Sequence, residues 1–291
     1  MDRGYVSLIW FIHVSSLMRR RTLLASGGTV IAGSIIGGGA VIRSIQTSGD
    51  RSVTCAETAL NQDRITEILL EETDRETAVY EVDGPEAGPT AVIIGGIHGD
   101  EINGYRVAAD ATDWEIDAGR LVVIPLADIV AIERNTREGP DGDLNRLFHG
   151  QQEPDSDLAR AIWNVVEGAN PDIVIDLHRS RGLFDTHHRW VGQAIFPTEA
   201  GDAINNAKYV SEYMNKHYVP QTMWFHRFVM GNVQNDQRDA GLLVQKVQLD
   251  LDVAGFLLES TEFLLDLETQ VRWTDAMTEL LLEQYGIRRT A

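Results

Sequence analysis

Short apolar runs, set apart by longer stretches of mixed character, dominate the hydrophobic pattern of this chain. Runs bounded by Gly, Pro or polar residues predict buried strands, here over 90–94, 120–125, 173–177 and 255–258. Alternating positions predict further strands, over 77–82 and 191–196. Helical spacing of apolar residues predicts helices, over 63–72, 103–111, 156–167, 200–218, 240–251 and 264–285.

The alternation of strands and helices decides the predicted fold class. It predicts α/β architecture: a single domain with a mostly parallel mixed sheet and helices on both faces. The helix over 156–167 has residues suited to an N-cap at Asp155 and Ser156. The polar segment 133–150 has no periodicity and predicts a long loop, and loops of that length inside a compact domain are commonly functional.

The beginning of the chain predicts a targeting segment. Arg19-Arg20-Arg21-Thr22-Leu23-Leu24 precedes a mildly apolar stretch rich in Gly and Ala. This order resembles a twin-arginine export signal. We therefore expect residues 1–50 to direct export to the cell surface or medium, or to stay as a membrane tether, with Met18 as an alternative start. The catalytic domain is expected over 60–291.

The charge balance is strongly acidic. The chain has 44 acidic and 25 basic residues, a formal net charge of -19, and its only lysines are Lys208, Lys216 and Lys246. This composition resembles that of proteins from salt-loving microbes, in which salt screens self-repulsion, and we expect a haloarchaeal origin. The charge argues against nucleic acid as a partner. Cys55 is the only cysteine, so any metal must be held by His and carboxylate.

Polar residues that can bind a metal follow several of the predicted strands. His98 and Glu101 come shortly after the strand 90–94, His178 directly after 173–177, and Glu259 directly after 255–258. In open α/β sheets, ligands bind beyond the carboxyl ends of the strands, so these side chains are expected to face one crevice. Imidazole and carboxylate are ligands that a catalytic zinc uses.

Motifs in chain order carry a resemblance to a known family. His98-Gly99-Asp100-Glu101, Asp143-Leu144-Asn145-Arg146, Asp176-Leu177-His178 and Gly255-Phe256-Leu257-Leu258-Glu259-Ser260-Thr261 resemble those of the zinc carboxypeptidase superfamily. They are most similar to its succinylglutamate desuccinylase/aspartoacylase branch, and the resemblance extends over about residues 90–285. It implies one Zn²⁺ per chain, held by His98, Glu101 and His178. Glu259 would be the general base, with Glu262 as a nearby rival.

The resemblance also implies roles in substrate binding. Asn145 and Arg146 match a clamp for a substrate carboxylate, because a planar guanidinium grips a carboxylate with two hydrogen bonds. Arg137 could polarise the scissile carbonyl, and Asp143 could orient His98.

Arg179 and Arg181 have two readings that the sequence leaves open. They could enlarge a positive pocket for an acidic substrate, or they could be paired surface charges.

The predicted function is that of a zinc-dependent hydrolase cleaving the amide bond of an N-acyl amino acid through metal-activated water. The expected partner is a small acidic or carboxylate-bearing substrate. The alternatives are a metallocarboxypeptidase acting on peptide C-termini and a zinc-binding relative without catalysis. The residues after Glu259 suffice for one helix, so the β domain that some deacylases carry there is expected to be missing, leaving the cleft more open.

Overall fold

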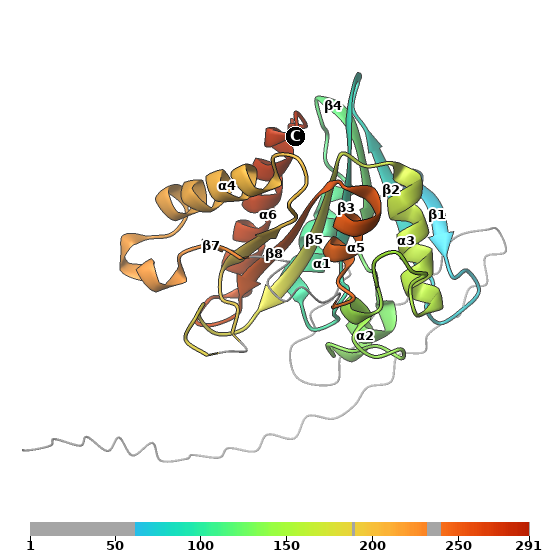
Figure 1. Ribbon diagram of the computed structural model, residues 1–291, viewed down its shortest axis with the longest axis horizontal. Coiled ribbons are helices and arrows are strands. Elements are labelled where there is room, and N and C mark those ends of the chain that lie inside the picture. Colours follow the sequence, from blue (N-terminus) through green and yellow to red (C-terminus); the bar gives the residue numbers. More distant parts are fainter. Residues whose placement is uncertain (1–61, 188–189, 232–239, 291) are drawn as a thin grey trace, which may run out of the picture. The chain divides into compact units, whose positions relative to one another are not determined.

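An eight-stranded mixed sheet forms the centre of the part of the chain that the computed structural model describes, residues 62–187, 190–231 and 240–290 (Figure 1). The predicted targeting segment, 1–50, lies outside these residues. The strand order is β1-β2-β4-β3-β5-β8-β6-β7. The strands are β1 Ile65–Leu69, β2 Thr77–Asp83, β3 Glu86–Gly95, β4 Ala118–Ile124, β5 Ile173–Ser180, β6 Ala194–Pro197, β7 Val229–Met230 and β8 Ala254–Thr261.

The middle of the sheet is parallel. Strand β3 pairs in parallel with β4 and β5, and β5 pairs in parallel with β8. The run from Ala91 to Ile94 is fully buried, as is Ile173 to Ile175, as expected for strands covered on both faces. Antiparallel pairing adds β2 beside β4, and β6 beside β8. The predicted fold class is therefore confirmed.

Helices cover both faces of this sheet. One apolar cluster contains residues of α1 (Ile102–Ala111), α4 (Ala203–His217) and α6 (Leu267–Gln284). The cluster on the opposite face contains residues of α3 (Asp157–Ala169), α5 (Leu243–Lys246) and the π-helical turn Val247–Leu251. The short helix α2 is Ile129–Arg134. Among the described residues, no helix has both the length and the apolar character needed to cross a membrane.

Side-chain caps set the beginning of several helices. The Ser156 hydroxyl accepts a hydrogen bond from the Ala159 amide at 3.1 Å, which confirms the cap predicted for α3. The Asp266 carboxylate likewise accepts from the Thr269 amide at 2.7 Å and caps α6. Gly286 follows α6 with a positive φ of 84°, a conformation that suits glycine at a helix end.

Two predictions of local structure are wrong. The segment 63–72 is not a helix, because a 3₁₀ turn at Gln62–Arg64 leads into strand β1, which pairs with β2. The backbone bonds to β2 decide this outcome, and they are not visible in the local apolar spacing. The segment 133–150 is not all loop, because it contains the end of α2 and a 3₁₀ turn at Leu144–Arg146.

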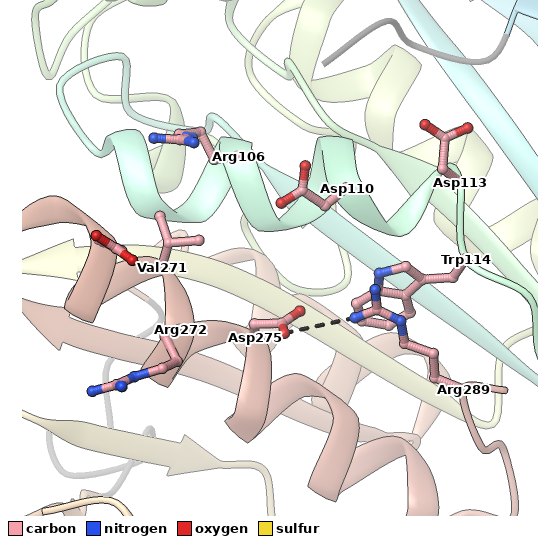
Figure 2. A pocket seen from close by; sticks show the side chains of 9 residues that line it. Arg106, Asp110, Asp113, Trp114, Val271, Arg272, Asp275 and Arg289 are labelled. Atoms are coloured by element: carbon pink, nitrogen blue, oxygen red, sulfur yellow. Dashed lines mark ion pairs between the residues drawn. The ribbon is translucent and has the colours of Figure 1, made fainter. Parts of the chain in front are cut away.

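A pocket between α1 and α6 lies apart from the predicted site residues, since none of them lines it (Figure 2). Its wall has mixed charge. The Arg289 guanidinium lies 4.8 Å from the centre of the Trp114 ring and 3.7 Å from the Asp275 carboxylate. The charges in this pocket are thus partly paired with one another.

Candidate active site

The loop after β3 carries two of the predicted metal ligands, His98 and Glu101. Gly96 has a φ of +78°, which lets the chain turn at the end of the strand. Gly99 lies so close to α2 that a Cβ there would be 2.0 Å from the Ala131 carbonyl carbon. Glu101 is the residue before α1. This tight packing leaves His98 only 2% exposed and Glu101 4% exposed.

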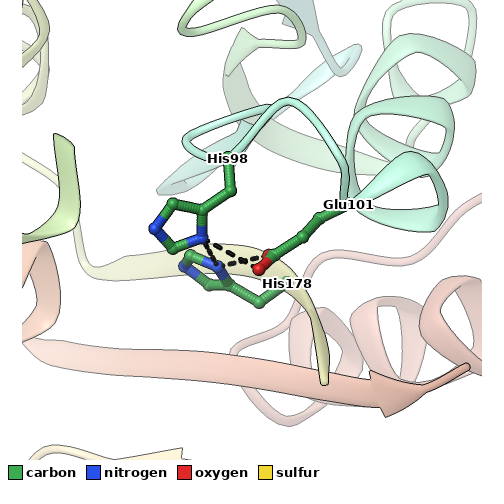
Figure 3. Close-up of side chains that lie close together, drawn as sticks. All are labelled: His98, Glu101 and His178. Atoms are coloured by element: carbon green, nitrogen blue, oxygen red, sulfur yellow. Dashed lines mark hydrogen bonds and ion pairs between the residues drawn. The ribbon is translucent and has the colours of Figure 1, made fainter. Parts of the chain in front are cut away.

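His98 and Glu101 from the loop after β3 converge with His178 from β5 (Figure 3). His98 Nδ1 lies 2.9 Å from Glu101 Oε1, and His178 Nδ1 lies 2.7 Å from Glu101 Oε2. The two Nδ1 atoms are 3.1 Å apart. All three side chains are buried, and each offers one ligand atom within 4.8 Å of the others. The three predicted metal ligands therefore lie together at the carboxyl end of β3 and β5.

The outer nitrogen of each imidazole contacts a carboxylate. His98 Nε2 lies 2.9 Å from Asp143 Oδ1, and His178 Nε2 lies 2.8 Å from Asp176 Oδ2. An imidazole that donates its Nε2 proton to a carboxylate has an Nδ1 lone pair free for a metal. Two such lone pairs 3.1 Å apart repel each other unless a cation lies between them. The residues present thus fit a zinc ion held by two histidines and one glutamate.

Carboxylates shift the pKa values of this group strongly. Burial alone would lower the pKa of His178, but Asp176 and Glu101 outweigh it and raise that pKa well above its usual value. The pKa of His98 is raised in the same way, against burial, by Glu101 and Asp143. Burial would raise the pKa of Glu101, but the two histidines lower it. The site therefore favours positive charge between its ligands.

Asn145, predicted to bind substrate, has its side chain engaged within the protein. It is 1% exposed, and its Oδ1 accepts a hydrogen bond from the Leu243 amide at 2.8 Å. Its Nδ2 lies 3.4 Å from Asp176 Oδ2 and 3.1 Å from His178 Nε2. Asn145 thus lies behind His178, where its Nδ2 donates to the same Asp176 oxygen that accepts from the imidazole.

The two predicted substrate-contacting arginines differ in their partners. Arg137 donates to Glu101 Oε1 at 3.1 Å and to Asp143 Oδ2 at 3.1 Å, so it lies against the candidate metal ligands. Arg146 is exposed, and its guanidinium donates to the Asn145 carbonyl at 2.6 Å. Within the described part of the chain, no ion pair joins Arg146 to a carboxylate, so its charge faces solvent beside the site.

The structure separates the two candidate bases. Glu259 is the register partner of His178 in neighbouring parallel strands. Its Oε2 atom is buried with no hydrogen-bond partner among the described residues. Burial and the nearby charge of Glu101 raise the pKa of Glu259 to about 8. Glu262 instead lies 3.4 Å from Arg179 and 3.6 Å from Arg181. Of the two candidate bases, Glu259 is the one with a buried carboxylate oxygen that has no partner among the described residues, whereas Glu262 pairs with arginines.

Arg179 and Arg181 are paired charges in this structure, which favours the second reading of the sequence. Arg181 also lies 3.2 Å from the Asp100 carboxylate. The Arg179 guanidinium donates to the Asp100 carbonyl, and its backbone amide donates to Glu101 Oε2 at 2.9 Å. Both arginines therefore tie the loop after β3 to β5.

Two buried residues of the site carried no predicted role. Asp176 is fully buried beside His178, and its position two residues earlier on the same strand could have revealed a shared face. Asn103 is also fully buried, and it donates to the His178 carbonyl at 3.0 Å. No sequence signal separates Asn103 from an ordinary residue in the first turn of a helix.

Comparison with known proteins agrees with this geometry. Residues 87–186 match the family model described as Succinylglutamate desuccinylase/Aspartoacylase catalytic domain, and this segment contains all three candidate metal ligands. A curated relative is N-alpha-acetyl-L-2,4-diaminobutyric acid deacetylase of Halomonas elongata. It is 33% identical over 129 residues, which cover 42% of this chain and 34% of the relative. The chain thus spans about a third of the length of that relative.

Solved structures share the fold. The cell shape determinant Csd4 of Helicobacter pylori, called a D,L-carboxypeptidase, matches with a TM-score of 0.61 at 19% identity, covering 72% of this chain and 55% of that one. A succinylglutamate desuccinylase/aspartoacylase of Rhodobacter sphaeroides matches with a TM-score of 0.52 at 21% identity, covering 73% and 60%. At these identities the likeness shows a common α/β architecture.

Proposed function

We propose that this chain is a zinc-dependent hydrolase of the succinylglutamate desuccinylase/aspartoacylase family, cleaving the amide bond of an N-acyl amino acid. The observation that carries the proposal is the convergence of the ligand atoms of His98, Glu101 and His178 beside Glu259, whose buried oxygen has no partner among the described residues. The family match over these ligands and the named activity of the deacetylase relative support it.

The residues divide the chemistry among them. His98, Glu101 and His178 would hold the zinc, which when bound makes water acidic enough to attack at neutral pH and polarises the carbonyl. Glu259 takes the proton from the attacking water and delivers it to the leaving amine. Arg137, already in contact with Glu101, is our proposal for stabilising negative charge on the carbonyl oxygen.

Arg146 is the group that would select the substrate class. Its exposed guanidinium, which forms no ion pair in the described part of the chain, can bind a substrate carboxylate with two hydrogen bonds. A peptide with a free C-terminus would satisfy the same contact. A metallocarboxypeptidase is therefore the second candidate, supported by the activity named for the Csd4 neighbour. A zinc-binding relative without catalysis is the third.

The test is Glu259→Gln in purified protein assayed on a panel of N-acyl amino acids and peptides in molar salt. We expect wild type to carry about one zinc per chain and to release free amine. The variant should keep its zinc and lose at least about a thousandfold in kcat, since the amide cannot accept a proton. Removing zinc with a chelator should abolish activity, and adding zinc back should restore it.

The panel also separates the alternatives. Cleavage of peptides but not of acyl amino acids would favour the carboxypeptidase. If the protein binds zinc but cleaves neither acyl amino acids nor peptides, it is the non-catalytic zinc-binding relative. Full activity of Glu259→Gln would show that Glu259 is not the base.

Localisation stays a proposal that rests on the arginines at 19–21. We propose export through a twin-arginine-type signal, a route that carries folded proteins and would let the metal bind before export. Replacing Arg19, Arg20 and Arg21 by Lys should keep the protein inside the cell, as measured by fractionation.

A further inference from the structure

Arg146, the proposed substrate-binding arginine, is part of the segment 145–152, whose backbone is held by Gly241 just before α5. The Phe148 amide donates to the Gly241 carbonyl at 3.0 Å. Gly241 has a φ of +70°, and a Cβ there would lie 2.3 Å from the Arg146 carbonyl oxygen. The backbone of Arg146 therefore packs directly on the segment that leads into α5.

Lys246 of α5 holds the far end of the same loop. Its side chain is 1% exposed, although it is one of only three lysines in the chain. The ammonium donates to the His149 carbonyl at 3.0 Å, to the Gln152 carbonyl at 2.6 Å and to Asp250 Oδ2 at 2.7 Å. An ammonium has three donors, so all of them are used, and two bind the backbone of the 145–152 loop.

Asp250 and Trp163 complete the surroundings of this cation. The second oxygen of Asp250 accepts from the Gln151 amide at 2.6 Å. The ring of Trp163 lies 4.6 Å from Lys246 Nζ, a favourable distance for a cation over an aromatic face. The Lys246–Asp250 pair therefore makes three hydrogen bonds to the loop backbone between His149 and Gln152.

Burying the Lys246 ammonium removes it from water at a cost in free energy, and an apolar residue of similar size would fill this space at lower cost. What an apolar residue cannot supply is the set of backbone bonds to the 145–152 loop. We propose that Lys246 is a positioning residue that fixes this loop and thereby presents the Arg146 guanidinium to the substrate carboxylate. This inference rests on the role proposed above for Arg146.

The test measures binding of N-acetylglycine, the smallest acyl amino acid, by calorimetry to zinc-loaded Glu259→Gln protein. In this background, Lys246→Met should weaken binding about tenfold, as expected for a misplaced binding group, while the zinc content stays unchanged. Lys208→Met and Lys216→Met are matched controls. Both lysines are exposed on α4, and both variants should bind the probe as the parent does.

A double variant separates positioning from general destabilisation. If Lys246 acts through Arg146, adding Lys246→Met to Arg146→Ala should change binding less than twofold. N-acetylglycinamide, which lacks the carboxylate, should bind parent and Lys246→Met alike. Unchanged binding in Lys246→Met, or a tenfold loss that persists in the Arg146→Ala background, would overturn the inference.

A second variant covers the case in which Lys246→Met does not fold. Asp250→Asn keeps the lysine and removes its anionic partner, and it should show the same dependence on Arg146. These outcomes are distinct from those of the hydrolase proposal. If the wild type cleaves no substrate, the hydrolase proposal is wrong. The binding comparison would still decide the role of Lys246. If Arg146→Ala and its parent bind N-acetylglycine equally well, the positioning role of Lys246 is wrong, whereas the hydrolase proposal is unaffected.

Discussion

Two buried histidines in this chain have opposite surroundings. His178 is 2% exposed, and its ring nitrogens lie within hydrogen-bond distance of Asp176 and Glu101. His226 is fully buried, and neither of its ring nitrogens has a hydrogen-bond partner among the described residues. Burial therefore lowers the pKa of His226, whereas carboxylates raise that of His178 against burial. Burial alone does not distinguish these two histidines, but their carboxylate partners do.

His226 should make the free energy of unfolding depend on pH. Its folded pKa lies below the unfolded value of about 6.5, so the unfolded chain binds more protons as the pH falls below that value. The contribution of neutral His226 to the free energy of unfolding should be fully present above pH 6.5 and should decrease below it. His226→Leu should reduce this slope by up to about 1 kcal/mol per pH unit. Urea unfolding at pH 7.5 and 5.5 measures it.

The exposed His217 of α4 supplies the control for this measurement. The slope of His226→Leu is compared with that of His217→Leu, which removes an imidazole from an exposed position. An equal slope in His226→Leu and wild type would show that His226 gains protons in the folded protein as readily as in the unfolded chain.

The sequence predicted individual site residues where they directly follow an apolar strand. His178 and Glu259 are candidates of this kind, and the two glycines after the apolar strand point to His98. The sequence could not show that Asn145 turns behind His178, because this placement depends on the Leu243 amide, which is distant in the chain. It could not show the role of Lys246 either, since a lysine on a predicted helix is ordinarily a solvated residue.

At the scale of elements, the local sequence pattern predicts the features that depend on contacts between residues close together in the chain. The cap of α3 lies within the sequence that specifies it, and it was predicted correctly. Strand β1 was mistaken for a helix because Ile65, Ile68 and Leu69 also have helical spacing. Its strand form depends on pairing with β2. Strand order across the sheet likewise depends on contacts between segments far apart in sequence.

The packing of the loop after β3 against α2 should be needed for metal binding. Gly99→Ala would place a methyl group 2.0 Å from the Ala131 carbonyl carbon, so the loop or the helix must shift. We expect a loss of about 1–3 kcal/mol in stability. Zinc affinity should drop at least about tenfold because His98 moves with the loop. Denaturant unfolding and competition with a zinc chelator measure the two effects.

Gly168 provides the matched control for this substitution. It lies in α3, and a Cβ there would meet no atom within 4 Å. Gly168→Ala should therefore stabilise the protein by about 0.5–1 kcal/mol through lower backbone entropy in the unfolded chain. Zinc affinity should stay the same. Unchanged zinc affinity in Gly99→Ala would mean that His98 does not depend on this contact.

At the scale of the whole molecule, the main feature is the large net negative charge that remains after the ion pairs have formed. The chain has a formal net charge of -19, and the ion pairs of the site use several of its arginines internally, such as Arg137 with Glu101 and Asp143. Excess carboxylates on the surface repel one another and destabilise the compact state. Salt reduces this repulsion over a Debye length that shrinks from about 10 Å at 0.1 M to about 3 Å at 1 M.

The midpoint of thermal unfolding should therefore rise with KCl concentration, most steeply below about 1 M. Sucrose, which strengthens burial without screening charge, serves as the control and should not reproduce the steep low-salt part of the curve. The exposed residues Glu71, Glu72 and Asp74 follow one another closely near β1. Replacing them by Gln, Gln and Asn should raise the midpoint in about 0.1 M KCl and flatten its salt dependence. A midpoint that is constant from low to molar KCl would mean that self-repulsion does not limit the stability of this protein, and the acidic composition would then need another explanation.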